Sequence, residues 1–152
     1  MKYTPSKINR WMLLKLPAAW LSGVRLTLID EKKCEAKVRF KWINQNPYRS
    51  MFWAVQGMAA ELTTGMLLTK SINDSNANIS MLLVSNKSSF HKKAVGKITF
   101  TCNEGEIAKQ LINSTIDNIT SKAWLKVKGY DEDGDLVSEF EFEWSCKKRK
   151  NG

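Results

Sequence analysis

A single carboxylate, Glu61, lies in the middle of a long apolar segment of this 152-residue chain. The segment from Ser50 to Thr69 reads SMFWAVQGMAAELTTGMLLT and contains no other charged side chain. A helix with this composition is expected to be buried on most of its sides. Removing an unpaired charge from water costs several kcal/mol, so Glu61 is expected to be paired, protonated or beside a solvated cleft.

Two glycines accompany Glu61 on one face of this predicted helix. Positions three or four apart share a helix face, which groups Glu61 with Ala54, Gly57 and Gly65. A glycine inside a helix costs ~1 kcal/mol relative to alanine, so the pair indicates a close approach by a ligand or by another backbone. The structural alternative is that Glu61 bonds a backbone group or a lysine in a packed interface. The residues alone leave both interpretations open.

The cysteines and the histidine argue against metal chemistry. Cys34, Cys102 and Cys146 lie far apart in strand-like segments and form no C-x-x-C pair, so neither a zinc site nor a disulfide framework is expected. His91 is the only histidine. We therefore predict no metal and no cofactor, and a reduced, cytoplasmic protein.

The net charge of +9 favours an anionic partner, which could be nucleic acid, a membrane surface or a phosphorylated small molecule. No helix-turn-helix, zinc or RNA-recognition signature accompanies the charge, so nucleic acid ranks low among these partners. No apolar run reaches the ~18 residues of a membrane span.

The remaining segments predict a single domain over residues 1–146, with an N-terminal helical unit over residues 1–22 and a basic tail over residues 147–152. One helix is expected from about Pro5 to Trp20. The long helix follows, with Ser50 as its N-cap, and the polar segment 71–78 is expected to be a loop. A second, short helix is expected over 104–116, with Asn103 as its cap. Alternating apolar residues predict strands over 24–28, 36–42, 95–102, 119–130 and 136–144, and segment 79–84 is expected to be a strand buried on both faces.

The last two predicted strands form a hairpin with oppositely charged outer faces. Lysines at 122, 126 and 128 face glutamates at 139, 141 and 143. Such pairs stabilise a sheet by ~0.2–1 kcal/mol each, so these charges are interpreted as sheet surface and not as catalysts. The order of elements predicts an α+β fold in which a curved antiparallel sheet wraps one long central helix.

With these elements in this order, the chain resembles the hotdog-fold thioesterase superfamily. Asn46 precedes Glu61 by fifteen residues, a spacing similar to that of the phenylacetate-pathway (PaaI-like) thioesterases. The uncharacterised thioesterase-like group DUF4442 is closer still, and it is matched here by Asn46, Ser50, Met51, Phe52, Ala60 and Glu61. The segment from Ser88 to Lys97 also looks like the strand-loop-strand joint of the family. The resemblance covers nearly the whole chain after the first helix.

The resemblance implies a site for an acyl thioester such as acyl-coenzyme A, with coenzyme A present only as part of the substrate. By analogy, Glu61 acts as general base or nucleophile and Asn46 orients the carbonyl or the water. The amides at the helix start, those of Phe52, Trp53 and Ala54, would stabilise the oxyanion. The resemblance implies a pocket lined by Gly57, Met58 and Gly65. It also implies that the phosphates of coenzyme A are bound by Lys87, His91, Lys92 and Lys93. Solvated turn lysines are the alternative for the last group.

Three departures from the family pattern keep a second function open. Trp53 and Ala54 replace a glycine pair, Phe52 replaces the more common histidine, and Arg49 replaces a loop glycine. A non-catalytic protein that binds an acyl or other hydrophobic ligand is therefore the alternative to a thioester hydrolase. The resemblance also implies a homodimer or a dimer of dimers, with 79–84 as the pairing edge.

Overall fold

The computed structural model describes residues 3–150. Four α-helices, one short 3-10 helix and six strands follow one another along this part of the chain. In chain order they are α1 (Pro5–Lys15), α2 (Pro17–Leu21), β1 (Arg25–Ile29), β2 (Cys34–Arg39), η1 (Trp42–Asn44), α3 (Trp53–Ser75), β3 (Ile79–Phe90), β4 (Lys97–Cys102), α4 (Gly105–Asn118), β5 (Thr120–Tyr130) and β6 (Leu136–Lys148).

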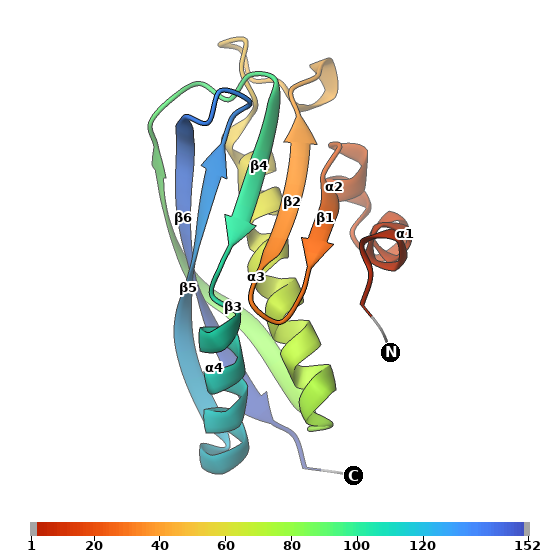
Figure 1. The fold of residues 1–152 in the computed structure, drawn as a ribbon, viewed down its shortest axis with the longest axis vertical. Coiled ribbons are helices and arrows are strands. Elements are labelled where there is room, and N and C mark those ends of the chain that lie inside the picture. The colour runs from red at the N-terminus through yellow and green to blue at the C-terminus, as the bar shows by residue number, and fades with distance from the viewer. Residues whose placement is uncertain (1–2, 151–152) are drawn as a thin grey trace.

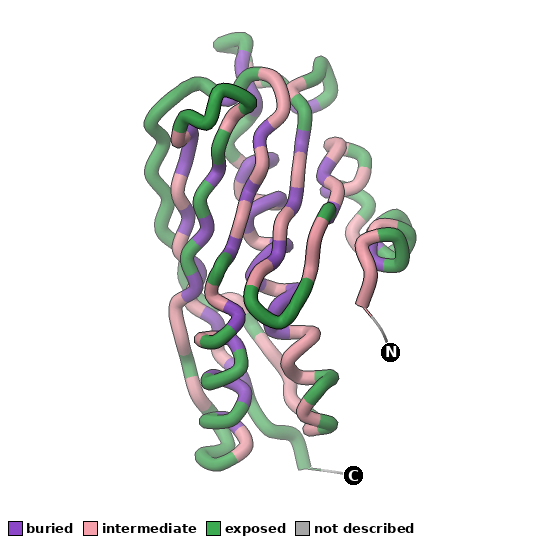
Figure 2. The backbone as a smooth tube through the Cα atoms, in the orientation of Figure 1, coloured by how far each residue is buried: buried purple, intermediate pink, exposed green. Residues whose placement is uncertain are grey.

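The six strands form one antiparallel sheet in the order β1-β2-β4-β5-β6-β3, which curves around α3 (Figure 1). The inner face of the sheet supplies the large buried side chains Phe100, Phe140, Phe142 and Trp144. The tube in Figure 2 shows the buried residues gathered along α3 and the strands that face it. This is the predicted α+β arrangement of a central helix wrapped by a curved sheet.

The helix boundaries differ from the predictions in three places. Pro17 divides the predicted N-terminal helix into α1 and α2, because a proline disfavours helical geometry at the residue before it, and Leu16 is extended in φ at −133°. The long helix begins at Trp53 after the uncapped Phe52, so the prediction of Ser50 as its N-cap is wrong. The same helix continues to Ser75, which makes most of the predicted polar loop helical.

The C-terminal helix is also capped differently from the prediction. The residue before α4 is Glu104, not Asn103, and its side chain makes no cap hydrogen bond. Instead Gly105 begins the helix with its amide 2.9 Å from the Lys32 carbonyl oxygen, so the turn between β1 and β2 takes up one of the helix's free donors.

Two strand predictions also need correction. β3 runs to Phe90 and most of its residues are exposed, so it is not a strand buried on both faces. β2 ends at Arg39, and Trp42, the last residue of the predicted strand, lies in η1 and is 82% exposed. The alternation of apolar and charged residues continues through Trp42, so it could not show that the strand ends before η1.

The hairpin of β5 and β6 has the predicted pairing. Lys126 lies opposite Glu141 and Lys128 opposite Glu139, with N–O distances of 3.6 and 3.9 Å. Lys122 lies opposite Ser145, so it has no glutamate directly across from it. β6 also continues through Lys147 and Lys148, the first two residues of the predicted tail.

The two edges of the sheet are protected to different degrees. At β1, the Asn9 side chain of α1 accepts from the Leu26 amide at 2.8 Å and donates to the Leu26 carbonyl at 2.9 Å. Within the described part of the chain, β3 pairs only with β6, and its Leu82 and Val84 are 65% and 41% exposed. Long exposed edges with apolar side chains are templates for another strand. None of the helices described between residues 3 and 150 has the length and apolar character needed to span a membrane.

Candidate functional site

A hollow of about 530 Å³ opens between the start of α3 and the segment after β3. The hollow is lined by residues from two of the groups predicted from the sequence. These are the helix start, predicted to bind the oxyanion, and the segment after β3, predicted to bind phosphate. The full lining of the hollow is Asn46, Pro47, Tyr48, Ser50, Met51, Phe52, Trp53, Gln56, Phe90, His91, Lys92, Lys93 and Ala94. We call this the Asn46 hollow. Its walls are mainly aromatic and apolar, as ligand pockets usually are.

Asn46 holds the loop that forms one wall of this hollow. Its side-chain oxygen accepts from the amides of Tyr48 and Ser50 at 2.9 and 3.2 Å, and its side-chain nitrogen donates to Ser50 Oγ at 3.0 Å. The turn bends at Arg49, where φ is +59°, a conformation that L side chains rarely adopt. A glycine, which the family resemblance leads us to expect at this position, would adopt this conformation without strain. Both polar atoms of Asn46 are thus used within the loop.

The start of α3 supplies two amides that have no partner among residues 3–150. The Phe52 amide donates to the Asn44 carbonyl at 2.8 Å, which removes it from the predicted oxyanion set. The amides of Trp53 and Ala54 have no acceptor within residues 3–150. A helix N-terminus with free N–H groups attracts negative charge, so these two amides remain suitable for an oxyanion.

The Trp53 ring lies along α3 over Gly57. A β-carbon placed on Gly57 would lie 4.0 Å from the Trp53 ring and 3.6 Å from the Phe140 ring. Both are ordinary contact distances. A β-carbon would therefore fit at Gly57, so neither ring approaches the helix closely enough to require a glycine, and Gly57 does not line the Asn46 hollow. Neither do the other two predicted pocket residues, Met58 and Gly65.

Glu61 lies further along α3 and is turned away from the hollow. A β-carbon at Gly65 would lie 3.5 Å from Glu61 Oε1 and 3.5 Å from the Trp144 ring, so the carboxylate points toward the C-terminal half of the helix. Trp144 is held there by a 2.9 Å hydrogen bond from its indole nitrogen to Thr64 Oγ1. Burial raises the pKa of the Glu61 carboxyl above its usual range. Within residues 3–150 the carboxylate has no hydrogen-bond donor and no cation partner.

Gln56 is the site residue that the sequence analysis missed. Its side chain is 96% buried at the floor of the Asn46 hollow, where its Oε1 accepts from Ser138 Oγ at 2.8 Å. Its nitrogen is 3.5 Å from the Met51 carbonyl, which is a weak contact. The sequence did contain one indication of this role, because Gln56 is a polar amide in an otherwise apolar segment. Only the fold, however, shows that its side chain faces the hollow and not solvent.

The four residues predicted to bind phosphate divide into separate groups. Lys87 lies on the outer face of the sheet with its Nζ 4.6 Å from the centre of the Trp124 ring, away from the Asn46 hollow. His91 bonds Glu139 at 2.9 Å. Lys92 donates to Asp131 and Asp135 at 2.6 and 2.7 Å, and these bonds raise the pKa of Lys92. Among the described residues, Lys93 bonds only the Tyr48 carbonyl, at 3.2 Å, and it is the member of the set best able to meet an anion.

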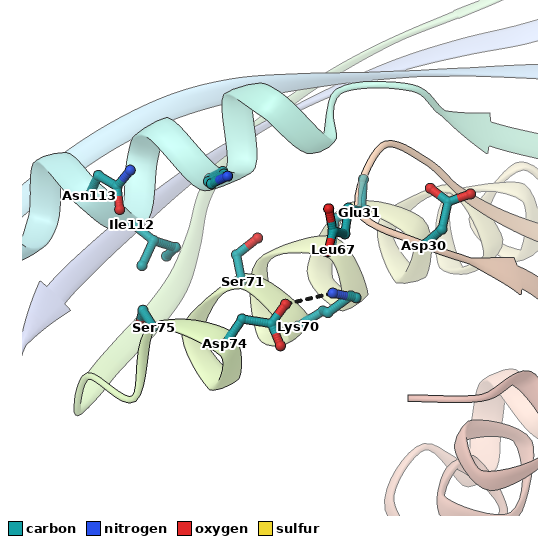
Figure 3. Close-up of a pocket in the computed structure, with 10 residues that line it drawn as sticks. Asp30, Glu31, Leu67, Lys70, Ser71, Asp74, Ser75, Ile112 and Asn113 are labelled. Carbon is teal, nitrogen blue, oxygen red and sulfur yellow. Dashed lines mark hydrogen bonds and ion pairs between the residues drawn. The ribbon is translucent and has the colours of Figure 1, made fainter. Parts of the chain in front are cut away.

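A second hollow, of about 310 Å³, lies between α3, α4 and the turn that joins β1 to β2 (Figure 3). Figure 3 shows Lys70 and Asp74 directed toward each other along α3, and the two form an ion pair at 2.5 Å. The pair satisfies both charges within the protein. This hollow contains none of the residues predicted from the sequence.

Solved structures share this architecture over almost their full length. A Pseudomonas aeruginosa protein, PA5026, described as a protein of unknown function and probable thioesterase, matches with a TM-score of 0.81 at 20% identity, over 96% of this chain and 97% of that one. The thioesterase HI1161 from Haemophilus influenzae matches with a TM-score of 0.73 at 10% identity, over 97% and 93%. A mutant of the Pseudomonas aeruginosa thioesterase PA1618 also matches with a TM-score of 0.73, at 9% identity, over 98% and 97%. No curated protein matches the sequence.

These likenesses, together with the helix wrapped by the sheet, define the fold as a hotdog fold. The family model described as "Domain of unknown function (DUF4442)" matches residues 5–146. The chain therefore belongs to the DUF4442 family, as its sequence resemblance indicated.

Proposed function

We propose that this protein hydrolyses an acyl thioester, with acyl-coenzyme A as the substrate class, at a site formed by two copies of the chain. The observation that carries the proposal is the Glu61 carboxylate, which is partly buried on an apolar helix and has no partner among the described residues. Because its pKa is raised, this carboxyl is a stronger base than an exposed one, which suits it to accept and return a proton. The fold shared with thioesterases supports the same reaction class.

In the proposed reaction, Glu61 takes a proton from water as the water oxygen bonds to the thioester carbon. The amides of Trp53 and Ala54 donate to the oxyanion that forms. Collapse of this intermediate breaks the carbon–sulfur bond, and the thiolate leaves with the proton held by Glu61. The products are a carboxylic acid and a thiol, and the reaction consumes no cofactor.

The geometry of α3 is the reason that the proposal requires two copies. Eight residues separate Trp53 from Glu61, which is about 12 Å along a helix. The carboxylate also points away from the helix start, toward Gly65. A general base must reach within about 3 Å of the reacting water, so Glu61 of one copy would serve the amides of another. The unpaired β3 edge is the proposed junction.

A mixed dimer with one defect per chain tests the shared site. One chain carries Glu61→Gln and the other Trp53→Pro, which removes an amide donor at a helix position where proline is tolerated. After co-expression and purification through two different tags, one of the two sites retains both groups. We expect about half of the wild-type turnover of acyl-coenzyme A from the mixed dimer, and very little from either parent.

The possible results separate the parts of the proposal. A mixed dimer as inactive as its parents would place both groups in one chain and reject the shared site. A wild-type protein that turns over no acyl-coenzyme A of any chain length would reject hydrolysis altogether.

One observation favours a non-catalytic ligand-binding protein as the second candidate. Trp53 and Phe52 are 54% and 45% exposed beside the free amides and pack edge to face, with ring centres 6.1 Å apart. Such rings can bind an acyl chain without any reaction. This function predicts that acyl-coenzyme A raises the melting temperature equally in the wild type and in Glu61→Gln, while neither protein releases a thiol.

A further inference from the structure

The N-terminal helices and η1 expose several large apolar side chains that do not attach these elements to the core. α1 is fixed to the core by Ile8 and Met12 and to β1 by Asn9. Six other large apolar side chains of this region are exposed. They are Trp11 (47% exposed), Leu13 (46%), Leu14 (78%), Leu21 (59%), Trp42 (82%) and Ile43 (54%). We call these six residues the N-terminal apolar surface.

The elements that carry this surface are joined to one another. Leu16 is both the C-cap of α1 and the N-cap of α2. The Asn44 side chain donates to the Ser22 carbonyl at 2.9 Å, which ties η1 to the end of α2. Figure 1 shows α1 and α2 beyond β1 at one edge of the sheet, with the segment after β2 above α2. The six side chains thus belong to one region of the molecule.

The charges of this region are of one sign. The sequence contains no Asp or Glu before Asp30, and none between Glu35 and Glu61. Around the apolar side chains lie Lys7, Arg10, Lys15 and Lys41. None of these four forms an ion pair within residues 3–150, whereas cations elsewhere on the molecule, such as Lys92, do.

We propose that the N-terminal apolar surface binds peripherally to an anionic lipid bilayer. Exposed leucines beside unpaired lysines and arginines are the features that hold a helix in the plane of a membrane interface. Tryptophans such as Trp11 and Trp42 favour the same interfacial region. The cations supply attraction to acidic headgroups, which neutral lipids cannot match.

A second copy of the chain fits this surface less well. It would bring the same cations against one another without a carboxylate to offset them. The junction proposed for two copies, β3, is at the opposite end of the sheet order from β1 and the helices beside it. Membrane binding is therefore independent of the proposed thioester hydrolysis and of the proposed dimer.

Vesicle sedimentation tests this inference with the full chain. The wild type is mixed with vesicles of phosphatidylcholine alone or with a third of phosphatidylglycerol added. The test variant carries Leu14→Ser and Leu21→Ser. The matched control carries Ile119→Ser and Val95→Ser, which replace apolar residues that are 61% and 51% exposed elsewhere. All three proteins are first compared by thermal melting, so that only folded protein is scored.

We expect the wild type to sediment with the anionic vesicles and to stay in solution with the neutral ones. The test variant should partition about tenfold more weakly, because membrane affinity scales with buried apolar area, and the control should match the wild type. Three results would each overturn the proposal. The first is a wild type that binds neither vesicle, and the second is a test variant that binds as well as the wild type. The third is a test variant whose only change is a smaller molecular mass in solution, because this result would make the surface a contact between copies.

Discussion

At the scale of single residues, Glu61 links the proposed chemistry to the stability of the fold. Burial raises the pKa of its carboxyl in the folded protein above the unfolded value. The folded state therefore holds the proton more tightly, and between the unfolded and the folded pKa the free energy of unfolding decreases as the pH rises.

The variant Glu61→Gln tests this linkage. Glutamine keeps the shape of the protonated acid and removes the titration, so the variant should be more stable than the wild type at pH 7 and should lose this advantage at pH 3.5. Urea unfolding at the two pH values measures the difference. Equal stability at both values would mean that the carboxylate finds a cation in the assembled protein, and the variant should in any case hydrolyse acyl-coenzyme A far more slowly.

Two substitutions of Trp53 separate the function of its ring from that of its amide. Trp53→Ala removes the ring and keeps the N–H, whereas Trp53→Pro removes both, and the extended Phe52 before it (ψ 132°) accommodates a proline. If the amide stabilises the oxyanion, the proline variant should lose about 10²–10³ in kcat relative to the alanine variant. Steady-state kinetics on one acyl-coenzyme A give this ratio. Equal rates for the two variants would show that the amide takes no part.

At the scale of elements, the position of α4 depends on one glycine. The first residue of the helix, Gly105, packs against the turn between β1 and β2, and an added β-carbon would overlap the Glu31 carbonyl oxygen. Backbone atoms cannot move aside as a flexible side chain can. Gly105→Ala should therefore lower the free energy of unfolding by about 1–3 kcal/mol.

Gly57→Ala is the matched control within α3. Its added β-carbon would make only ordinary contacts, the nearest at 3.6 Å, and alanine favours a helix. This variant should gain roughly 0.5–1 kcal/mol of stability. Urea unfolding of both proteins checks the pair, and a loss at Gly57 as large as that at Gly105 would contradict the packing described for both helices.

The sequence predicted the periodic elements well and their ends less well. The β5–β6 hairpin could be predicted because its apolar side chains and its lysines and glutamates alternate without interruption. The start of α3 could not, because Ser50, a good cap by type, bonds instead to Asn46 in a loop whose shape depends on the left-handed Arg49. Gln56 was missed for a related reason: its partner Ser138 is 82 positions away in the sequence.

At the scale of the whole molecule, the two edges of the sheet have different consequences. Asn9 of α1 occupies the backbone groups of Leu26 on β1, so this edge is already protected. β3 has no such cover among residues 3–150, and its outer residues Leu82 and Val84 are apolar. The proposed site shared by two copies would require a contact, and β3 is the edge that can form one with continuous strand pairing.

The double variant Leu82→Lys/Val84→Lys should separate the two copies, because lysines on an edge strand disfavour pairing with another strand. Light scattering should give the mass of one chain, 17.4 kDa, for this variant and twice that or more for the wild type. Thr27→Lys on the protected edge strand β1 is the control and should keep the wild-type mass. Since Glu61 of one copy could then no longer reach the free amides of another, the variant should also lose thioester hydrolysis while its melting temperature stays above the assay temperature. A single chain that remains fully active would show that one copy suffices.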